Sequence, residues 1–142
     1  MPDKALKHPI PAAIAVVIRN AQVLLVRRAN PPNQHRWGFP GGKIEIAETI
    51  KVAAIRELKE ETGVTAEALR VLDAIDVFVP NQKGSIEQHY VLIAVLCRWT
   101  MGEALAASDA AEARWFSIEK LDEADPNLLP HVVRIANQAL DP

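Results

Sequence analysis

The feature that most constrains this chain is a charged stretch over residues 42–64, whose centre reads RELKEE at 56–61. Residues three and four apart share one face of a helix, so a helix here would gather Glu57, Glu60 and Glu61 into one patch. Like charges at that spacing repel and weaken a bare helix. A divalent cation removes the conflict, because Mg²⁺ takes carboxylate, water and phosphate oxygens as ligands. The stretch therefore predicts either a metal-binding helix or a solvated charged helix.

The flanks of this stretch favour a helix with defined ends. Gly63 stands where a left-handed residue would stop the helix. Gly41 and Gly42 follow a proline, which predicts a tight turn before the helix. Glu48 lies eight residues before Arg56, about two helical turns away, so we expect these two side chains to pair. A solvated charged helix does not explain these features together.

These positions resemble the Nudix box, G-x5-E-x7-R-E-U-x-E-E-x-G-U, in which U is a bulky aliphatic residue. Every fixed position matches, and the matching residues are Gly42, Glu48, Arg56, Glu57, Leu58, Glu60, Glu61, Gly63 and Val64. The chain is therefore identified as a member of the Nudix hydrolase family, with a pattern most similar to ADP-ribose pyrophosphatases. The resemblance implies an α/β fold, namely an α/β/α sandwich with a mixed β-sheet.

The resemblance also implies a chemistry. Nudix relatives hydrolyse a nucleoside diphosphate linked to another group, with divalent metals holding the phosphate oxygens. It implies Mg²⁺ as the cofactor, with Mn²⁺ as an alternative, and the implied ligands are Glu57, Glu60, Glu61 and a backbone carbonyl at Gly41 or Gly42. Arg56 and Glu48 are implied to orient these ligands from behind.

The general base stays open at this point. Family members take it from the box helix or from a later loop. Glu112 is the candidate outside the box, because E-x-x-W-F at residues 112–116 resembles a common Nudix segment at the substrate edge of the sheet. The alternative for Glu112 is a solvated loop acid, and in that case Glu57 is the better candidate for activating water.

Five further residues are candidates for contacting substrate, and they are Arg27, Arg28, Trp37, Lys43 and Pro80. A guanidinium matches phosphate oxygens, although both arginines also fit a solvated strand end. Trp37 either stacks on a base or packs beneath its loop. Pro80 lies sixteen positions after Val64, where proline looks like a marker of ADP-ribose pyrophosphatases. A proline also simply ends a strand.

Three functions follow from these observations. The first is hydrolysis of ADP-ribose to AMP and ribose 5-phosphate. The second is a MutT-like pyrophosphohydrolase of nucleoside triphosphates, including oxidised ones. The third is a non-catalytic Nudix domain that senses a nucleotide, which the intact box glutamates disfavour.

Composition limits the partners and the compartment. We expect the 142 residues to form one domain, 1–142, with a formal net charge of −2 that offers no basic field for nucleic acid. Cys97 is the only cysteine, so no internal disulfide forms, and its apolar surroundings predict a buried thiol. No apolar run reaches membrane-spanning length. We expect a cytoplasmic enzyme that takes a small nucleotide substrate, contacts no membrane, and resembles relatives of which many are homodimers.

The rest of the chain reads as strands and helices in an alternating order. The expected strands are 12–18, 22–26, 69–79 as one or two strands, 89–99 buried on both faces, and 113–117. The expected helices besides the box helix are a short one at 118–121 and a final one over 129–140 with Pro130 in its first turn. Two substantial helices with strands before, between and after them favour an α/β/α sandwich with a mixed sheet.

Overall fold

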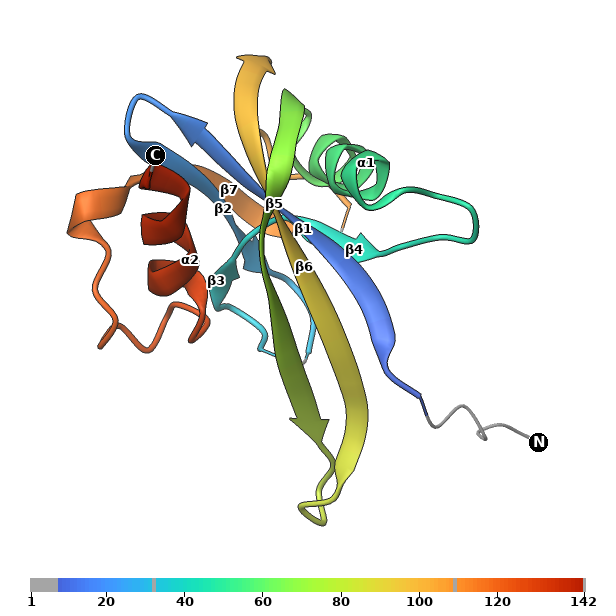
Figure 1. Ribbon diagram of the computed structural model, residues 1–142. Coiled ribbons are helices and arrows are strands. Elements are labelled where there is room, and N and C mark those ends of the chain that lie inside the picture. The colour runs from blue at the N-terminus through green and yellow to red at the C-terminus, as the bar shows by residue number, and fades with distance from the viewer. Residues whose placement is uncertain (1–7, 32, 109, 142) are drawn as a thin grey trace.

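A computed structural model describes residues 8–31, 33–108 and 110–141. Its strands are β1 (Ile10–Arg19), β2 (Gln22–Arg28), β3 (Trp37–Gly38), β4 (Gly41–Lys43), β5 (Thr65–Pro80), β6 (Ile86–Met101) and β7 (Ala110–Ser117). Its helices are α1 (Ile50–Thr62), the 3₁₀ helix η1 (Ile118–Lys120) and α2 (Val132–Leu140). Figure 1 shows α1 and α2 on opposite sides of the strands.

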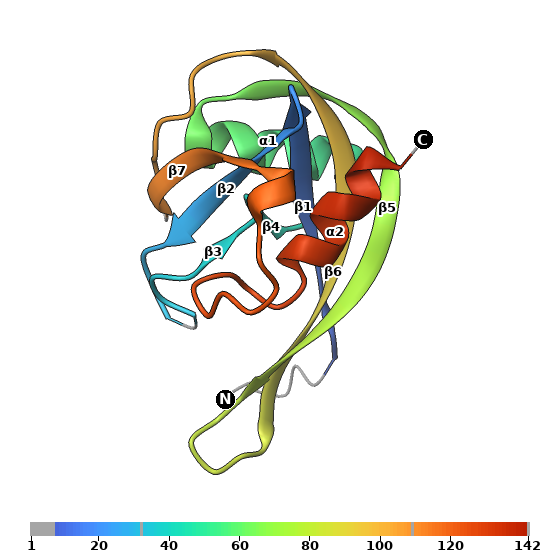
Figure 2. The same ribbon diagram turned by 90° about the vertical axis from the view of Figure 1, so that its left-hand side faces the viewer.

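The seven strands form one mixed sheet. Its central order is β3-β2-β1-β6-β5, with β4 paired to β1 and β7 paired to β2. The β1–β6 pair is parallel, whereas the other pairs are antiparallel. The two views in Figures 1 and 2 place α1 over one face and α2 over the other. The predicted α/β/α sandwich with a mixed sheet is confirmed.

Strand β1 divides the core between the two helices. Because successive side chains of a strand point to opposite faces, Ala13, Ala15 and Val17 join the cluster beneath α1. Ile14 and Val16 join the cluster beneath α2. The small side chains on the α1 side let that helix lie close to the sheet, which fixes the charged face of α1 relative to β4.

Helix α1 has the ends that the sequence favours. The hydroxyl of Thr49 accepts a hydrogen bond from the Val52 backbone N–H at 3.2 Å, which caps the first turn. At the other end Gly63 has φ = 76°, and its N–H donates to the Lys59 carbonyl at 2.9 Å. The predicted left-handed stop at Gly63 is therefore confirmed.

The structure corrects the bounds of the last helix. Helix α2 starts at Val132 rather than at Leu129, so Pro130 precedes the helix instead of standing in its first turn. The backbone explains the difference, because the Leu129 N–H donates to the Trp37 carbonyl at 2.9 Å. The residues before the helix therefore lie beside β3 and hydrogen-bond to its backbone.

The structure also corrects several strands. Residues 65–80 form one strand rather than beginning at 69, and β7 begins at Ala110 rather than at 113. Strand β6 was expected to be buried on both faces, but only Ala94, Val95 and Cys97 are fully buried. The reason is that β5 and β6 extend as a hairpin beyond the body of the domain (Figure 1). The short strands β3 and β4 lie where the sequence predicts only a loop and a turn.

Two smaller observations concern Cys97 and membranes. Cys97 is fully buried as predicted, and burial raises the pKa of its thiol to about 12. Its sulfhydryl donates to the Val95 carbonyl. Among the described residues, no helix has both the length and the apolar character needed to span a membrane.

Candidate active site

Arg56 is the centre of a charge network on α1. Its Nε donates to Glu48 Oε2 at 2.6 Å and its Nη2 donates to Glu48 Oε1 at 3.0 Å, which confirms the expected pair. Its Nη1 donates to Glu57 at 3.0 Å and to Glu60 at 3.3 Å. The Nη2 group also donates to the Lys43 backbone carbonyl at 3.2 Å. One guanidinium therefore ties α1 to both the preceding loop and strand β4. These hydrogen bonds raise the pKa of Arg56 further above its ordinary range.

Glu57 and Glu61 form a pair of carboxyl groups one helical turn apart. Burial first, and then the neighbouring Glu57 carboxyl group, raises the pKa of Glu61 to about 8. A backbone hydrogen bond from Gly41 and the charge of Arg28 lower the pKa of Glu61, but by less than these effects raise it. Two carboxyl groups held this close repel each other when both are ionised.

The glycines before the helix make this approach possible. A β-carbon built on Gly42 would lie 2.4 Å from Glu57 Oε2, so any larger residue would displace the carboxylate. A β-carbon on Gly41 would lie 2.3 Å from the Ala13 carbonyl oxygen of β1. Glycine at both positions lets backbone and carboxylate meet at close range.

This arrangement fits a hard divalent cation. A cation held by Glu57 and Glu61 would favour their ionised forms against the burial and the mutual contact that raise the pKa of Glu61, and both groups offer the oxygen ligands that Mg²⁺ prefers. Glu60 is turned toward Arg56 and is half-exposed. Accordingly, the described residues contain no group of three His, Cys, Asp or Glu side chains already gathered as a metal site. The structure therefore shows two candidate ligands, Glu57 and Glu61, and a third carboxylate, Glu60, that contacts Arg56 instead.

A cleft of about 1220 Å³ opens beside these carboxylates. One end is formed by Gly41, Gly42, Glu57 and Glu61, with Lys43 of β4 and Glu45 of the adjoining loop beside them. The wall near β2 is formed by Arg28 and by the loop that carries Asn30 and Asn33. The opposite end is formed by β5, β6 and the start of α2, which Figure 2 shows close together. The cleft thus joins the charged face of α1 to a region that the sequence did not single out.

Some predicted substrate residues line this cleft and others do not. Arg28 and Lys43 line it, whereas Pro80 lies one residue beyond the last β5 residue that does. Trp37 is buried, and its ring meets the edge of Phe116 at a centroid distance of 4.9 Å. Of the two readings for Trp37, the structure therefore shows packing.

Glu112 lies between two arginines on the sheet. Arg27 Nε donates to Glu112 Oε1 at 3.3 Å, and Arg114 donates to the other carboxylate oxygen. The Arg114 contact is the main cause that lowers the pKa of Glu112 below its ordinary value. Glu112 and Arg27 are not among the residues that line the cleft. A role for Glu112 as general base or metal ligand stays a prediction.

The sequence did not single out, as contacts for substrate, the cleft residues on β5, on β6 and at the start of α2, which are Ile75, Asp76, Val77, Phe78, Val79, Tyr90, Leu92, Leu129, Pro130, His131 and Arg134. They come from two strands and a helix that are far apart in the chain. Strand alternation could have shown that Val77 and Val79 share a face. Nothing in the local sequence indicates that this face meets His131.

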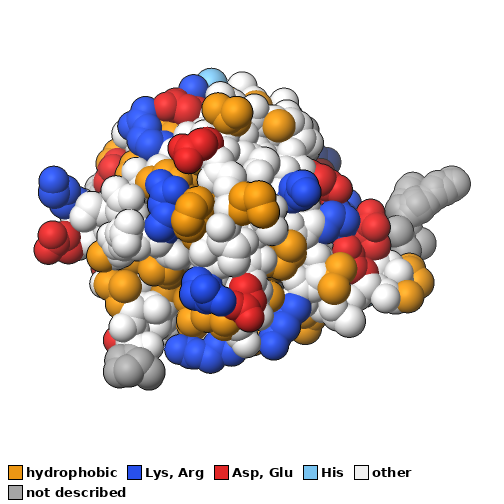
Figure 3. Space-filling model, turned by 90° about the horizontal axis from the view of Figure 1, so that it is seen from above, with side chains coloured by type: hydrophobic (Ala, Val, Ile, Leu, Met, Phe, Trp, Pro, Cys, Tyr) orange, Lys and Arg blue, Asp and Glu red, His pale blue; other side chains and the backbone are white. Residues whose placement is uncertain are grey.

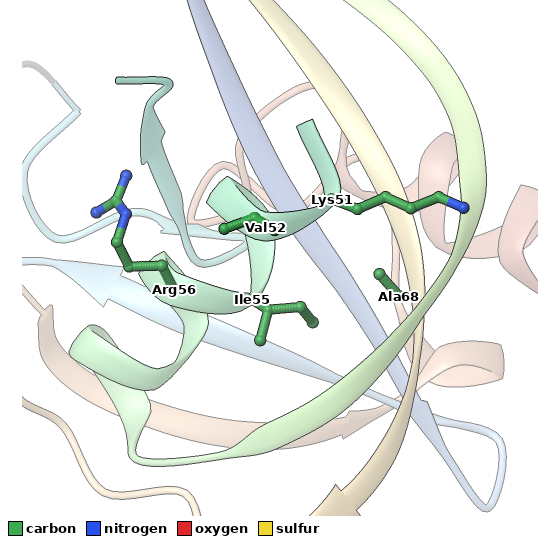
Figure 4. Close-up of a pocket in the computed structure, with 5 residues that line it drawn as sticks. All are labelled: Lys51, Val52, Ile55, Arg56 and Ala68. Carbon is green, nitrogen blue, oxygen red and sulfur yellow. The ribbon is translucent and has the colours of Figure 1, made fainter. Parts of the chain in front are cut away.

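A second hollow, of about 450 Å³, lies between α1 and β5 on the other side of the helix. It is lined by Lys51, Val52, Ile55, Arg56 and Ala68 (Figure 4). Lys51 and Arg56 extend in opposite directions away from the hollow, and the Lys51 ammonium donates to the Leu69 carbonyl at 3.1 Å. The apolar side chains that remain offer no reactive group.

Charge on the molecular surface is mixed. Figure 3 shows basic and acidic side chains interspersed with apolar ones across the face seen from above. This distribution agrees with the small formal net charge of −2. On that face the described residues form no continuous basic surface of the kind that nucleic acid requires.

The α/β/α fold and the carboxylates and arginine of α1 define the Nudix class of domains. The NUDIX domain profile matches residues 9–135, so the chain belongs to this family. The chain is 31% identical over 114 residues to the ADP-ribose pyrophosphatase of Methanocaldococcus jannaschii, covering 80% of this chain and 65% of that protein. It is 35% identical over 69 residues to the 8-oxo-dGTP diphosphatase of Escherichia coli, covering 46% of this chain and 54% of that protein.

A solved structure supports the same fold. The MutT NUDIX hydrolase from Burkholderia pseudomallei superposes with a TM-score of 0.77 at 28% identity, over 95% of this chain and 100% of that one. The chain spans less than two thirds of the length of several curated relatives, including the archaeal protein above. These similarities establish the family and the fold. The relatives' names give two different substrates, ADP-ribose and 8-oxo-dGTP.

Proposed function

We propose that this chain is a Mg²⁺-dependent pyrophosphohydrolase that cleaves the diphosphate of nucleoside diphosphate derivatives. The observation that carries the proposal is the pair of carboxyl groups, Glu57 and Glu61, that faces Gly41 and Gly42 at one end of a large cleft. The intact box disfavours a domain that only senses a nucleotide, because degenerate sensing domains tend to lose box glutamates and this chain keeps Glu57, Glu60 and Glu61. Mn²⁺ is the alternative metal.

The residues of α1 would divide the work between holding and orienting. Glu57, Glu60 and Glu61 are the proposed metal ligands, with the backbone at Gly42 beside them. Arg56 and Glu48 fix the helix against β4 and so set where these carboxylates point. Mg²⁺, when bound, supplies positive charge that offsets the pyrophosphate and lowers the pKa of water.

The remaining residues of this end of the cleft would receive the diphosphate. Lys43 and Arg28 both line the cleft, and both carry a charge that attracts phosphate oxygens. Glu112 is held by two arginines, so we place the acceptance of the water proton on the box carboxylates, with Glu57 first. Arg27 contacts Glu112 and does not line the cleft, so we assign it no contact with the diphosphate.

We propose ADP-ribose as the preferred substrate, with AMP and ribose 5-phosphate as the products. The archaeal relative bears the name ADP-ribose pyrophosphatase, and Pro80 stands at the position that looks like a marker of that group. The cleft of about 1220 Å³ is large enough for a group on each side of a diphosphate. The E. coli relative favours the second candidate, a MutT-like hydrolysis of nucleoside triphosphates including 8-oxo-dGTP.

The test is a substrate panel with Mg²⁺, with products resolved by chromatography. It contains ADP-ribose, dGTP and 8-oxo-dGTP, and it measures kcat/KM for each. We expect ADP-ribose to give the highest kcat/KM. A triphosphate that yields its monophosphate and pyrophosphate faster would favour the MutT-like activity, and no hydrolysis of any member would reject the pyrophosphohydrolase.

A further inference from the structure

The last turn of α1 is held by a segment that is distant in the chain. The last four carbonyl groups of an α-helix have no partner within the helix, and those of Glu61 and Thr62 belong to this set. The loop between β6 and β7 supplies their partners. The Ala107 N–H donates to the Glu61 carbonyl at 2.9 Å, and the Leu105 N–H donates to the Thr62 carbonyl at 2.9 Å. Figure 2 shows this loop passing the C-terminal end of α1.

The loop reaches the helix through its backbone. The side chains of Leu105, Ala106 and Ala107 are all exposed, and Leu105 exposes 72% of its surface. They therefore add little packing that would hold α1. The N–H of Ala106, which stands between the two donors, makes no hydrogen bond to any described residue. The two alternate N–H groups of the loop are thus its main contacts with the last turn of α1.

The start of the loop lies directly against the end of the helix. Gly102 has φ = 103°, and a β-carbon built there would lie 2.8 Å from the Gly63 carbonyl oxygen. Trp99 Nε1 donates to the Gly102 carbonyl at 3.0 Å. Two residues further on, Ala104 packs against the core cluster beneath α1. The indole of Trp99 therefore fixes the point from which the loop runs along α1.

Trp99 belongs to a stack of three side chains. The guanidinium of Arg19, at the end of β1, lies 4.8 Å from the ring centroid of Trp99 and 4.4 Å from that of Trp115. A cation between two indole faces is attracted by both rings. Trp99 and Trp115 stand on β6 and β7, the two strands that the loop joins. Within the described residues the Trp115 Nε1 is buried without a hydrogen-bond partner, so it holds no part of the loop.

Glu57 and Glu61 differ in how their backbones are held. Glu57 stands well inside α1, where hydrogen bonds within the helix fix its carbonyl. Glu61 is the residue before the last one of the helix, and its carbonyl is fixed by Ala107. A cation shared by the two carboxylates needs both at set positions. The position of Glu61 therefore depends on the loop, whereas that of Glu57 does not.

We propose that the β6–β7 loop positions Glu61 for the metal, with Leu105 and Ala107 as backbone donors and Trp99 as the positioning residue that sets the loop. Without these contacts the last turn of α1 frays, and the Glu61 carboxylate moves away from Glu57. Trp99, Leu105 and Ala107 are not among the residues that line the cleft, so they act through Glu61 and not on the substrate. This inference rests on the proposed function, since it assumes that Glu61 holds the metal.

The first test uses proline to remove a single N–H from the loop. Ala107→Pro removes the donor to the Glu61 carbonyl. Ala106→Pro is the matched control, because it places a proline in the same loop at an N–H without a partner. Ala107→Ser changes the side chain and keeps the donor. Titration calorimetry without substrate measures the Kd of Mg²⁺, and hydrogen exchange in the metal-free protein measures protection of the Gly63 amide. Thermal unfolding checks the fold of each variant.

We expect Ala107→Pro to weaken Mg²⁺ binding about tenfold, as loss of a group that orients a metal ligand does. It should also speed exchange of the Gly63 N–H, which bonds to the Lys59 carbonyl and so reports on the last turn. Ala106→Pro and Ala107→Ser should match the wild type in both measurements. KM for ADP-ribose at saturating Mg²⁺ should be the same in all of these proteins.

The second test compares the two tryptophans, and it does not depend on a proline being tolerated. Trp99→Phe keeps a ring beside Arg19 but loses the hydrogen bond to Gly102. Trp115→Phe is the matched control, because it keeps a ring on the other side of Arg19 and loses an N–H without a partner. We expect Trp99→Phe to weaken Mg²⁺ binding, by less than Ala107→Pro does, and Trp115→Phe to bind Mg²⁺ as the wild type does.

Equal Mg²⁺ affinity of Ala107→Pro and Ala106→Pro would overturn the role of the loop, and so would unchanged exchange of the Gly63 amide in Ala107→Pro. Equal affinity of Trp99→Phe and Trp115→Phe would overturn the role of Trp99. Failure of the proposed function would appear separately, as a wild-type protein that binds no Mg²⁺ and hydrolyses no member of the substrate panel.

Discussion

The two helices on opposite faces of the sheet contribute to the cleft in different ways. Helix α1 brings a dense set of charges, in which Arg56 contacts three glutamates and Glu57 raises the pKa of the buried Glu61. Helix α2 brings one neutral imidazole and one arginine that is already paired with Asp73. The cleft is therefore strongly charged at one end and largely apolar at the other.

This difference suggests a division of tasks. A metal and a diphosphate need several charges at short and fixed spacing, which a single helix supplies. Choice of the group attached to the diphosphate needs surfaces from several elements, which only the folded sheet supplies. Changes on α1 should therefore affect the reaction itself, and changes near α2 should affect stability or the choice of ligand.

The largest effect is expected from the box carboxylates. Glu57→Gln, Glu60→Gln and Glu61→Gln should each lower kcat by roughly 100-fold or more, equivalent to about 2.7 kcal/mol of barrier, because each removes a proposed metal ligand. Steady-state kinetics with ADP-ribose measures this loss. Glu119→Gln, at an exposed position of the 3₁₀ helix η1, is the matched control and should keep full turnover. Near-normal kcat in the three box variants would end the assignment of the reaction to α1.

A smaller effect is expected from Arg56→Lys. Lysine keeps the positive charge but cannot contact Glu48 and Glu57 with a planar fork, so the carboxylates lose their fixed direction. Loss of such an orienting residue lowers activity by about 10–100-fold. We also expect a fall of several degrees in unfolding temperature. Arg98→Lys, in an exposed pair with Glu67, should change neither quantity. An Arg56→Lys enzyme with wild-type kcat would remove the orienting role.

Glu112→Gln should lower kcat only slightly. Arg27 and Arg114 both donate hydrogen bonds to the Glu112 carboxylate and keep it ionised. Glu112 is also not one of the residues that line the cleft. A general base contributes about 10²–10⁴-fold to rate. A fall in kcat of that size, with little change in KM, would indicate that Glu112 is the general base or a metal ligand. It would also weaken the contrast between the two ends of the cleft.

The smallest effect is expected from Asp73→Asn, which removes the anchor between β5 and α2. Hydrogen bonds from Arg134 hold the pKa of Asp73 below its ordinary value. A carboxyl group with a lowered folded-state pKa stabilises the protein above the unfolded pKa, and it loses that contribution as pH falls through the folded value. Thermal unfolding should therefore show Asp73→Asn slightly less stable than the wild type at neutral pH. The two proteins should converge at acid pH, and a constant difference at all pH values would contradict the ionic anchor.

The α1 end was predictable from the sequence because its chemistry lies within one stretch of chain. Fixed spacing along a helix determines which side chains meet, so the Glu48–Arg56 pair could be predicted and is confirmed. The family and the fold were implied by the resemblance of residues 42–64 to the Nudix box, and both are confirmed. Gly63 was equally clear, because a left-handed residue after a helix favours glycine.

The α2 end could not be predicted in the same way. Tyr90 and His131 meet the same cleft only because β6 and α2 lie together across the sheet. The start of α2 depends on pairing between Leu129 and Trp37, and no local signal shows that pairing. Trp37 packs on Phe116 for the same reason, since its partner comes from β7. Such contacts follow from the fold and not from the spacing of residues.

The most direct test of the central claim is Mg²⁺ binding in the absence of substrate, measured by titration calorimetry on the wild type, Glu61→Gln and His131→Leu. Our account places the cation on the carboxylates of α1 and gives His131, at the start of α2, no part in holding it. It predicts that His131→Leu binds Mg²⁺ as the wild type does, whereas Glu61→Gln binds it much more weakly while keeping its fold. Wild-type affinity for Mg²⁺ in Glu61→Gln would contradict the account.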